Sequence, residues 1–301
     1  MALTTSTLVQ QLYTDVLADI ALFTADATLL TNPQFVGSMM NIEGISGNTV
    51  RIPTQTAWSS AGQVGEGNSI IQANDYSYDP GAVNVTMKKF GSGSDVTEES
   101  LEDGGIDLVR SQLLSGLSGA LAQAIDEDGF ATLYAGATET ANVAAGAGTH
   151  NLVVSPMSVA MANKRDPKVT MFYDVDTDKH LFRASTRAGW AVVPNGAAGD
   201  VGVRSVKDES TVGSGAATLA DFAKAVAQLR AANHTTMQNG FYAGFICPAT
   251  ELAIAQQLTS IAATSGTVGD LSAIGNGVLA SSVIGQAVGI SFNRTNNLTS
   301  N

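Results

Sequence analysis

Carboxylates are the residues of this sequence that come closest to forming a chemical site. Asp174, Asp176 and Asp178 alternate within five residues, as the first ligands of a calcium-binding loop do. Such a loop also needs glycine at its sixth position and glutamate at its twelfth. This sequence has Lys179 and Ser185 there. We therefore expect a solvated hairpin turn, and an adventitious cation site is the alternative.

Two other segments could carry chemistry by residue type, but their spacing does not support it. The run Asp126-Glu-Asp128 falls in a helical pattern, where three adjacent carboxylates cannot share one face, so we expect a solvated helix surface. The run Gly91-Ser-Gly-Ser-Asp95 is glycine-rich like a phosphate-binding loop but lacks the Lys-Ser/Thr that follows one. We expect it to be a flexible joint between a strand and a helix.

The nucleophiles and metal-ligand types are equally sparse. Cys247 is the one cysteine of the chain and lies in an apolar, strand-like run, which favours a buried and inert thiol. The three histidines are too far apart for a local zinc motif, and no G-x-S-x-G motif is present. The sequence therefore predicts no catalytic residue, no cofactor site and no metal site, and the protein is not expected to be an enzyme.

Composition limits the function classes further. Only 14% of the 301 residues are charged, against ~25% in an average globular protein, and 31 are glycine. The net charge of −12 gives no electrostatic footprint for binding a phosphate backbone. The sequence shows neither a secretory signal nor an apolar run of about 18 residues that would span a membrane. We expect synthesis inside the cell and a surface that is covered largely by neighbouring molecules.

The sequence of the N-terminal third predicts a helix and two strands that cannot form a hydrophobic core by themselves. Residues 8–23 have the apolar spacing of an amphipathic helix. Residues 49–52 and 83–87 alternate as two strands, and about 30 polar and glycine-rich residues connect them. Because this arm has little apolar content, we expect it to lie on a partner surface.

The rest of the chain mixes helices and strands without a repeat, so the predicted fold class is α+β. Asp95 and Glu98 have capping-box spacing ahead of a long helix. The predicted elements are that helix at 106–133, a β hairpin at 166–193, a helix at 219–229, a strand at 241–247, a helix from Pro248 to about residue 261, and a strand at 285–292.

Several of these segments resemble one family. They are Gly93-Ser-Gly-Ser-Asp-Val-Thr-Glu-Glu-Ser-Leu-Glu-Asp103 with the helix after it, the hairpin at 166–193, Gly240-Phe-Tyr-Ala-Gly-Phe-Ile-Cys-Pro248 with the helix before it, and Ile284-Gly-Gln-Ala-Val-Gly289 within 278–292. Together they resemble the major capsid proteins of tailed bacteriophages, which have the Hong Kong ninety-seven type fold.

The resemblance implies a division into four parts. These are an N-terminal arm (1–40), an extension loop with an extended β hairpin (41–95), a peripheral domain with the spine helix 106–133 and the hairpin 166–193 (96–212), and an axial domain (213–301). In relatives the long strands usually follow the axial domain, whereas here they precede it. Two interpretations follow: either the segment order is permuted, with the axial domain at the C-terminus, or one of the segments is assigned to the wrong part.

The resemblance also implies a function. The chain would assemble into hexamers and pentamers of an icosahedral shell that encloses double-stranded DNA without specific binding, in the host bacterial cytoplasm. Its partners would be other copies of itself, a separate scaffolding protein, a portal protein and, as an option, a decoration protein; no membrane is involved. An oligomeric bacterial surface or envelope-layer protein is the alternative, and an enzyme with a dispersed site is a third.

Residues of the extension loop are the expected contacts between subunits. They are Arg51, Trp58, Glu66, Lys88 and Lys89. Some relatives join their subunits through a Lys–Asn isopeptide bond from this loop, but residues 57–69 contain no lysine here. Because the arm helix starts within ten residues of Met1, we also expect no large cleavage during maturation.

Overall fold

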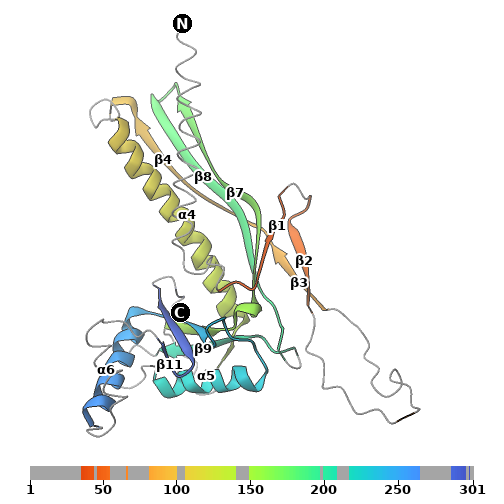
Figure 1. The fold of residues 1–301 in the computed structure, drawn as a ribbon. Helices are drawn as coiled ribbons and strands as arrows, with labels where there is room; N and C mark the ends of the chain where they lie inside the picture. Colours follow the sequence, from red (N-terminus) through yellow and green to blue (C-terminus); the bar gives the residue numbers. More distant parts are fainter. Residues whose placement is uncertain are drawn as a thin grey trace.

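The computed structural model describes most of the chain between residues 35 and 298. The described residues are 35–43, 46–54, 66, 81–99, 106–139, 149–196, 199–208, 217–264, 286–295 and 298. Figure 1 shows an elongated part, formed by a long helix beside long strands, which stands on a compact part with two helices. The predicted arm helix at 8–23 lies outside the described residues.

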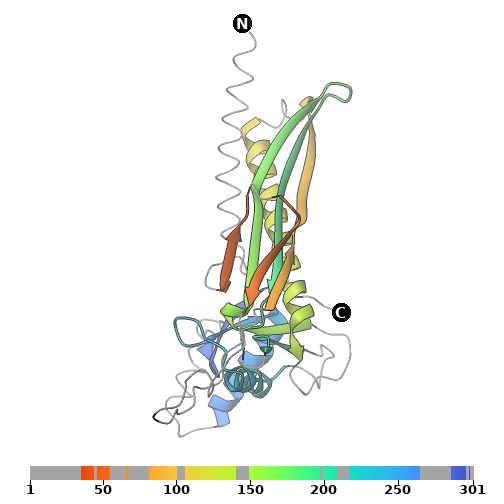
Figure 2. The ribbon, with the colours of Figure 1, turned by 90° about the vertical axis from the view of Figure 1, so that its right-hand side faces the viewer.

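The elongated part is one helix against one sheet. Helix α4 (Ile106–Gly136) lies along a sheet with the strand order β1-β7-β8-β4, which Figure 2 shows from the side. The strands are β1 (Ser38–Asn41), β7 (Val159–Asp174), β8 (Lys179–Val192) and β4 (Lys88–Thr97). Strands β7 and β8 form the predicted hairpin, and α4 confirms the predicted long helix.

Alternation along β8 decides which face of this sheet is buried. Phe182, Ala184, Ala188 and Trp190 are buried and share a core with apolar residues of α4. The indole nitrogen of Trp190 donates a hydrogen bond to the carbonyl of Ile125 in α4. Residues at the odd positions before Gly189 point to the opposite face, because successive side chains of a strand alternate.

Strand β4 corrects one prediction. Gly91–Asp95 is not a flexible joint but the middle of a ten-residue strand, and it pairs with β8 from Lys88–Ala188 to Thr97–Lys179. The glycines have low strand propensity by themselves, but the backbone of β8 supplies a complete ladder of hydrogen-bond partners. Tertiary pairing thus overrides the local preference.

The predicted pair of strands at the extension loop is confirmed. Strands β2 (Thr49–Thr54) and β3 (Gly81–Thr86) pair in antiparallel register. Their apolar residues Ile52 and Val85 pack on Ala160 and Ala191, on the face of the four-stranded sheet that is turned away from α4. The base of the loop is therefore fixed on the sheet even though the pair is too small to form a core.

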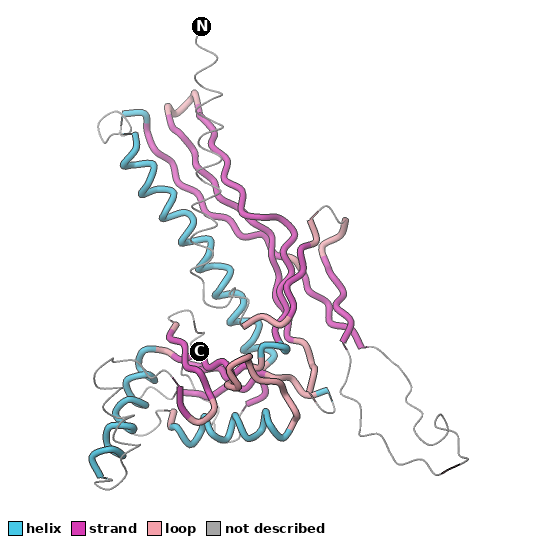
Figure 3. Tube along the Cα trace, viewed as in Figure 1, coloured by secondary structure: helices cyan, strands magenta, loops and turns pink. Residues whose placement is uncertain are grey.

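The compact part is a six-stranded sheet with the order β11-β12-β10-β6-β9-β5. Its strands are β11 (Gln286–Ala287), β12 (Ile290–Arg294), β10 (Tyr242–Ile246), β6 (Thr149–Val154), β9 (Val203–Asp208) and β5 (Thr138–Glu139). Its helices are α5 (Leu219–Ala231) and α6 (Pro248–Thr264), which the tube in Figure 3 shows beside the sheet. A capping box between Thr218 and Asp221 starts α5, as its sequence predicts.

One core joins the two parts. The ring of Phe245 in β10 meets Phe130 of α4 edge-on at 5.1 Å and Phe35 at 5.2 Å between ring centroids. Residues 35 and 36, at the end of the predicted arm, are buried in this core. The six-stranded sheet also takes strands from both sides of the predicted boundary at 212/213, so no single cut in the sequence separates its strands from the rest.

Candidate functional site

The five predicted contact residues are spread over the extension loop and its base. Arg51 is exposed on β2, Glu66 is exposed in a turn, and Lys89 is exposed on β4. Trp58 lies outside the described residues. Three of the four described side chains are thus open to solvent. The other one, Lys88, binds a residue of the same chain.

Lys88 forms an ion pair with the spine helix. Its Nζ lies 2.5 Å from Asp128 Oδ1 of α4, and the other carboxylate oxygen of Asp128 is buried without a hydrogen-bond partner. Asp126 is almost fully buried, with 1% relative exposure. The prediction of a solvated acidic surface at Asp126–Asp128 is therefore wrong for Asp126. The helix turns that residue toward the core, where only the tertiary packing could place it.

Basic side chains gather on the face of the sheet away from α4. Lys89 and Arg165 are the cross-strand neighbours of Arg187, and the next positions bring in Lys168 beside Ser185 and Arg183 beside Thr170. We call this set the cationic face: Lys89, Arg165, Lys168, Arg183 and Arg187. It contains 5 of the 15 Lys and Arg residues of a chain with net charge −12.

The cationic face has no carboxylate partners within the described part of the chain. The seven ion pairs found there involve other residues. Arg165 and Arg187 donate hydrogen bonds to Ser185 Oγ and Asn48 Oδ1, which are neutral acceptors. Like charges directly opposite each other in a sheet are destabilising, so this arrangement has a cost that folding alone does not explain.

The end of the same hairpin is acidic and apolar. Its turn is confirmed at residues 175–178, where Asp174 accepts hydrogen bonds from the backbone of Asp176 and from the hydroxyl of Thr177. Val175 is 80% exposed. We call this region the acidic tip: Asp174, Val175, Asp176 and Asp178.

A phenol is tied to the acidic tip. Tyr173 donates a hydrogen bond to Asp178, and this bond, with the nearby negative charge, raises the pKa of Tyr173 to about 12. Asp178 has a positive φ of 52°, which aspartate tolerates better than most residues. The carboxylate of Asp178 thus has a structural task in the turn.

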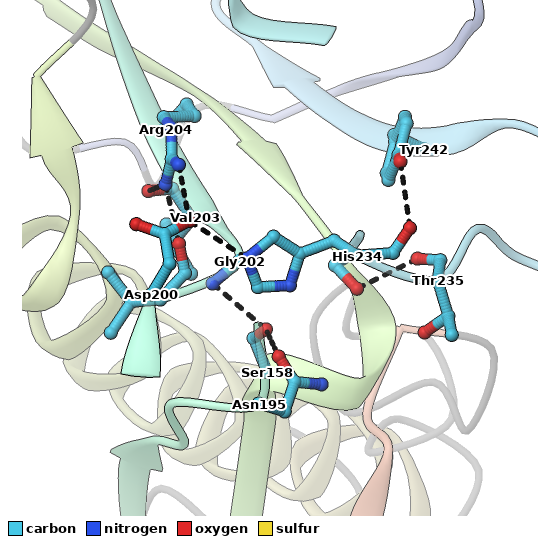
Figure 4. A network of polar contacts seen from close by, with 11 residues as sticks. Ser158, Asn195, Asp200, Gly202, Val203, Arg204, His234, Thr235 and Tyr242 are labelled. Carbon is cyan, nitrogen blue, oxygen red and sulfur yellow. Dashed lines mark hydrogen bonds and ion pairs between the residues drawn. The ribbon is translucent and has the colours of Figure 1, made fainter. Parts of the chain in front are cut away.

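A buried polar network lies where the elongated and compact parts meet (Figure 4). Ser158, at the start of β7, accepts a hydrogen bond from the backbone of Gly202 and donates one to Asn195. Ser155 donates to the carbonyl of Thr235. A Cβ on Gly202 would lie 2.1 Å from Ser158 Oγ, so only glycine fits there.

The charged members of this network are Asp200, Arg204 and His234. Burial alone would raise the pKa of Asp200, but hydrogen bonds and charge from Arg204 and His234 outweigh it and hold that pKa below its ordinary value. His234 Nδ1 is buried without a hydrogen-bond partner, and Nε2 of the same ring lies 2.9 Å from Asp200 Oδ2. Asp200 is held by Arg204 and His234, and the side chain of His234 has no exposed surface that a substrate could reach, so we regard the network as structural.

The remaining candidates offer no chemistry. Cys247 is buried, as predicted, and its sulfur lies 3.1 Å from Thr250 Oγ1. Across the described ranges, no three His, Cys, Asp or Glu side chains are grouped to hold a metal ion. None of the described helices is both long and apolar enough to cross a membrane.

Sequence reasoning missed the cationic face. The signal that could have found it is the basic residues at 183 and 187 on one strand and at 165 and 168 on its partner. Their alignment depends on the register of β7 with β8, which contains irregularities between Asn163 and Lys168. Only the structure reveals that these residues lie side by side.

Residues 79–186 match a family described as "Phage capsid protein". This segment extends from β3 through β4, α4, β5, β6 and β7 into β8, and it therefore contains most of the hairpin and four of the five cationic residues. No curated protein matches the sequence of the chain.

Three solved structures show partial similarity to the chain. One is the procapsid of bacteriophage JBD30, with 12% identity, 81% of this chain and 89% of that chain covered, and a TM-score of 0.47. The capsid of bacteriophage JBD30 has 14% identity, coverages of 74% and 81%, and a TM-score of 0.46. A virus-like particle from Pyrococcus furiosus has 10% identity, coverages of 64% and 98%, and a TM-score of 0.41.

Proposed function

We propose that this chain, whose residues 79–186 match a family described as "Phage capsid protein", builds an icosahedral shell of hexamers and pentamers around double-stranded DNA. The chain is a structural subunit of the capsid and not an enzyme. The family match carries this conclusion, since it spans strand β4, the spine helix, strand β7 and the first half of β8.

The geometry of the extension loop supports a role in assembly. Strands β2 and β3 carry exposed residues along most of their length, and only Ile52, Thr54 and Val85 are buried. A two-stranded pair of this kind is marginal in water by itself. We propose that the loop of one copy lies on a neighbouring copy, with Arg51, Trp58, Glu66 and Lys89 at the contact.

The division into domains follows from the same proposal. The arm would be 1–40, the extension loop 41–95, the peripheral domain 96–212 and the axial domain 213–301. Strands β5, β6 and β9, which precede residue 213, add to the sheet of the axial part. The long strands β7 and β8 precede α5 and β10 in the chain, and we propose a permuted segment order for this reason.

The proposed partners are those that a shell requires. They are other copies of the chain, a separate scaffolding protein, a portal protein and a decoration protein. The net charge of −12 supports a container that does not bind its DNA specifically, because an acidic wall repels a phosphate backbone. The shell would form in the host bacterial cytoplasm.

Sedimentation and negative-stain microscopy test the proposal. The full chain is produced alone and together with the scaffolding protein of the same phage. Closed particles, or rings of five and six, are the expected result. A compact monomer near 30.9 kDa under every condition would overturn the proposal.

A further inference from the structure

The long hairpin carries two surfaces of opposite charge that cannot reach each other within one chain. The cationic face includes Arg183 and Arg187 on β8, and the acidic tip begins where β8 starts at Lys179. At ~3.4 Å per residue, Arg183 lies about 14 Å and Arg187 about 27 Å along β8 from Lys179, beyond the reach of an ion pair. Helix α4 packs along the hairpin and keeps it extended.

We propose that the cationic face binds the acidic tip of a second copy of this chain. This inference rests on the proposed function, because a capsid shell brings many copies of the chain into contact. Each copy carries one surface of each kind, so every cationic face has one acidic tip available to it in an assembly of copies. The contact is head-to-tail, and contacts of this type close into rings or extend, depending on the rotation between copies.

Apolar side chains beside the charges strengthen this assignment. Phe172 is 53% exposed, and it lies next to Leu181 on the same face, between the cationic residues and the tip. Val175 at the tip is 80% exposed. Large exposed apolar residues with a charged rim are typical of protein–protein contacts, whereas a duplex backbone offers phosphates and sugars to such a surface.

The charge of the whole chain also favours a second copy over DNA as the partner. A DNA duplex on the cationic face would also lie near the three carboxylates of the acidic tip, which repel its phosphates. A second copy, by contrast, presents an excess of 12 negative charges. The cationic face supplies the attraction that copies of an acidic chain need to associate.

A charge swap tests the contact with two exposed residues. Arg183→Glu changes the cationic face and Asp176→Lys changes the tip; among the described residues, neither side chain has a bonded partner. We expect each single variant to raise the protein concentration needed for assembly about tenfold or more, since like charges then face each other across the contact. The double variant R183E/D176K should restore assembly to near the wild-type concentration.

Matched controls separate this effect from net charge and from folding. Arg230→Glu and Glu127→Lys make the same charge changes at exposed positions outside the two surfaces and outside the ion pairs of the described residues, and we expect them to assemble like the wild type. Circular dichroism and thermal unfolding of every variant should match the wild type. Mixing the R183E and D176K chains should also restore assembly, because each acidic or altered tip can then bind a face of opposite charge on the other variant.

The outcomes distinguish this inference from the proposed function. Rescue in the double variant and in the mixture supports the contact. Wild-type shells with single variants that assemble normally, or single variants that the swap does not rescue, would overturn the contact and leave the shell function intact. Variants that lose binding of duplex DNA but keep assembly would assign the cationic face to DNA instead. A wild-type chain that never assembles would remove both.

Discussion

His234 Nε2 lies 2.9 Å from Asp200 Oδ2, and the side chain of His234 has no exposed surface. The same carboxylate oxygen pairs with Arg204, which is 5% exposed at its side chain. Asp200 thus connects strand β9 to the segment after α5, at the place where the elongated and compact parts share their core.

Asp200→Asn should destabilise the protein by about 2–4 kcal/mol at pH 7, because the buried guanidinium of Arg204 loses its counter-charge. The pKa of Asp200 is lowered in the folded chain. Its stabilisation is therefore complete above the unfolded pKa of ~3.9 and is lost as the pH falls through the folded value. Urea unfolding at pH 7 and pH 3.5 checks this. The gap between wild type and variant should narrow at pH 3.5, and a constant gap would contradict the assignment.

Lys88→Met should lower the free energy of unfolding by about 1–2 kcal/mol, since Asp128 keeps a mostly buried carboxylate without its cation. Lys89→Met is the matched control, because Lys89 is exposed on the opposite face of β4 and its change should stay within about 0.5 kcal/mol. Chemical denaturation of both variants measures the difference. Equal effects at the two positions would show that the ion pair with α4 contributes nothing.

Gly189→Ala should cost about 1–3 kcal/mol through overpacking. A Cβ at this position would lie 2.5 Å from the carbonyl oxygen of Thr86 and 3.0 Å from Val85 Cγ1, so the base of the extension loop would have to shift. Gly116→Ala in α4 is the control: a Cβ there meets nothing within 4 Å, and alanine favours the helix by about 0.5–1 kcal/mol. Thermal unfolding should move in opposite directions, and a neutral G189A would refute the close contact.

Asp178→Asn should lower the pKa of Tyr173 from about 12 toward the ordinary value of ~10, because the hydrogen bond from the phenol to a carboxylate and the negative charge of that carboxylate are both removed. Asparagine suits the test since it tolerates the positive φ at this position. Absorbance titration at alkaline pH measures this pKa. The same titration of Tyr173→Phe identifies the part of the signal that comes from Tyr173. An unchanged titration would show that Tyr173 does not donate to Asp178.

The local pattern of the sequence predicts most helices and strands. The apolar spacing of residues 106–133 and 219–229 predicts α4 and α5, and alternation predicts β2 and β3. The Thr218–Asp221 capping box forms as expected, and Cys247 is buried as its apolar run indicates. These features depend on residues within one or two turns of each other, so the sequence determines them directly.

Long-range pairing decided the rest. Gly91–Asp95 became a strand because β8 lies beside it, and Asp126 became buried because α4 packs with that side toward the core. Lys89, Arg165 and Arg187 came together from three separate strands through the register of the sheet. The sequence by itself determined the elements, their order and the excess of negative charge. Only the tertiary structure decided which side chains face each other, because a shift of one residue in strand pairing moves every side chain to the opposite face.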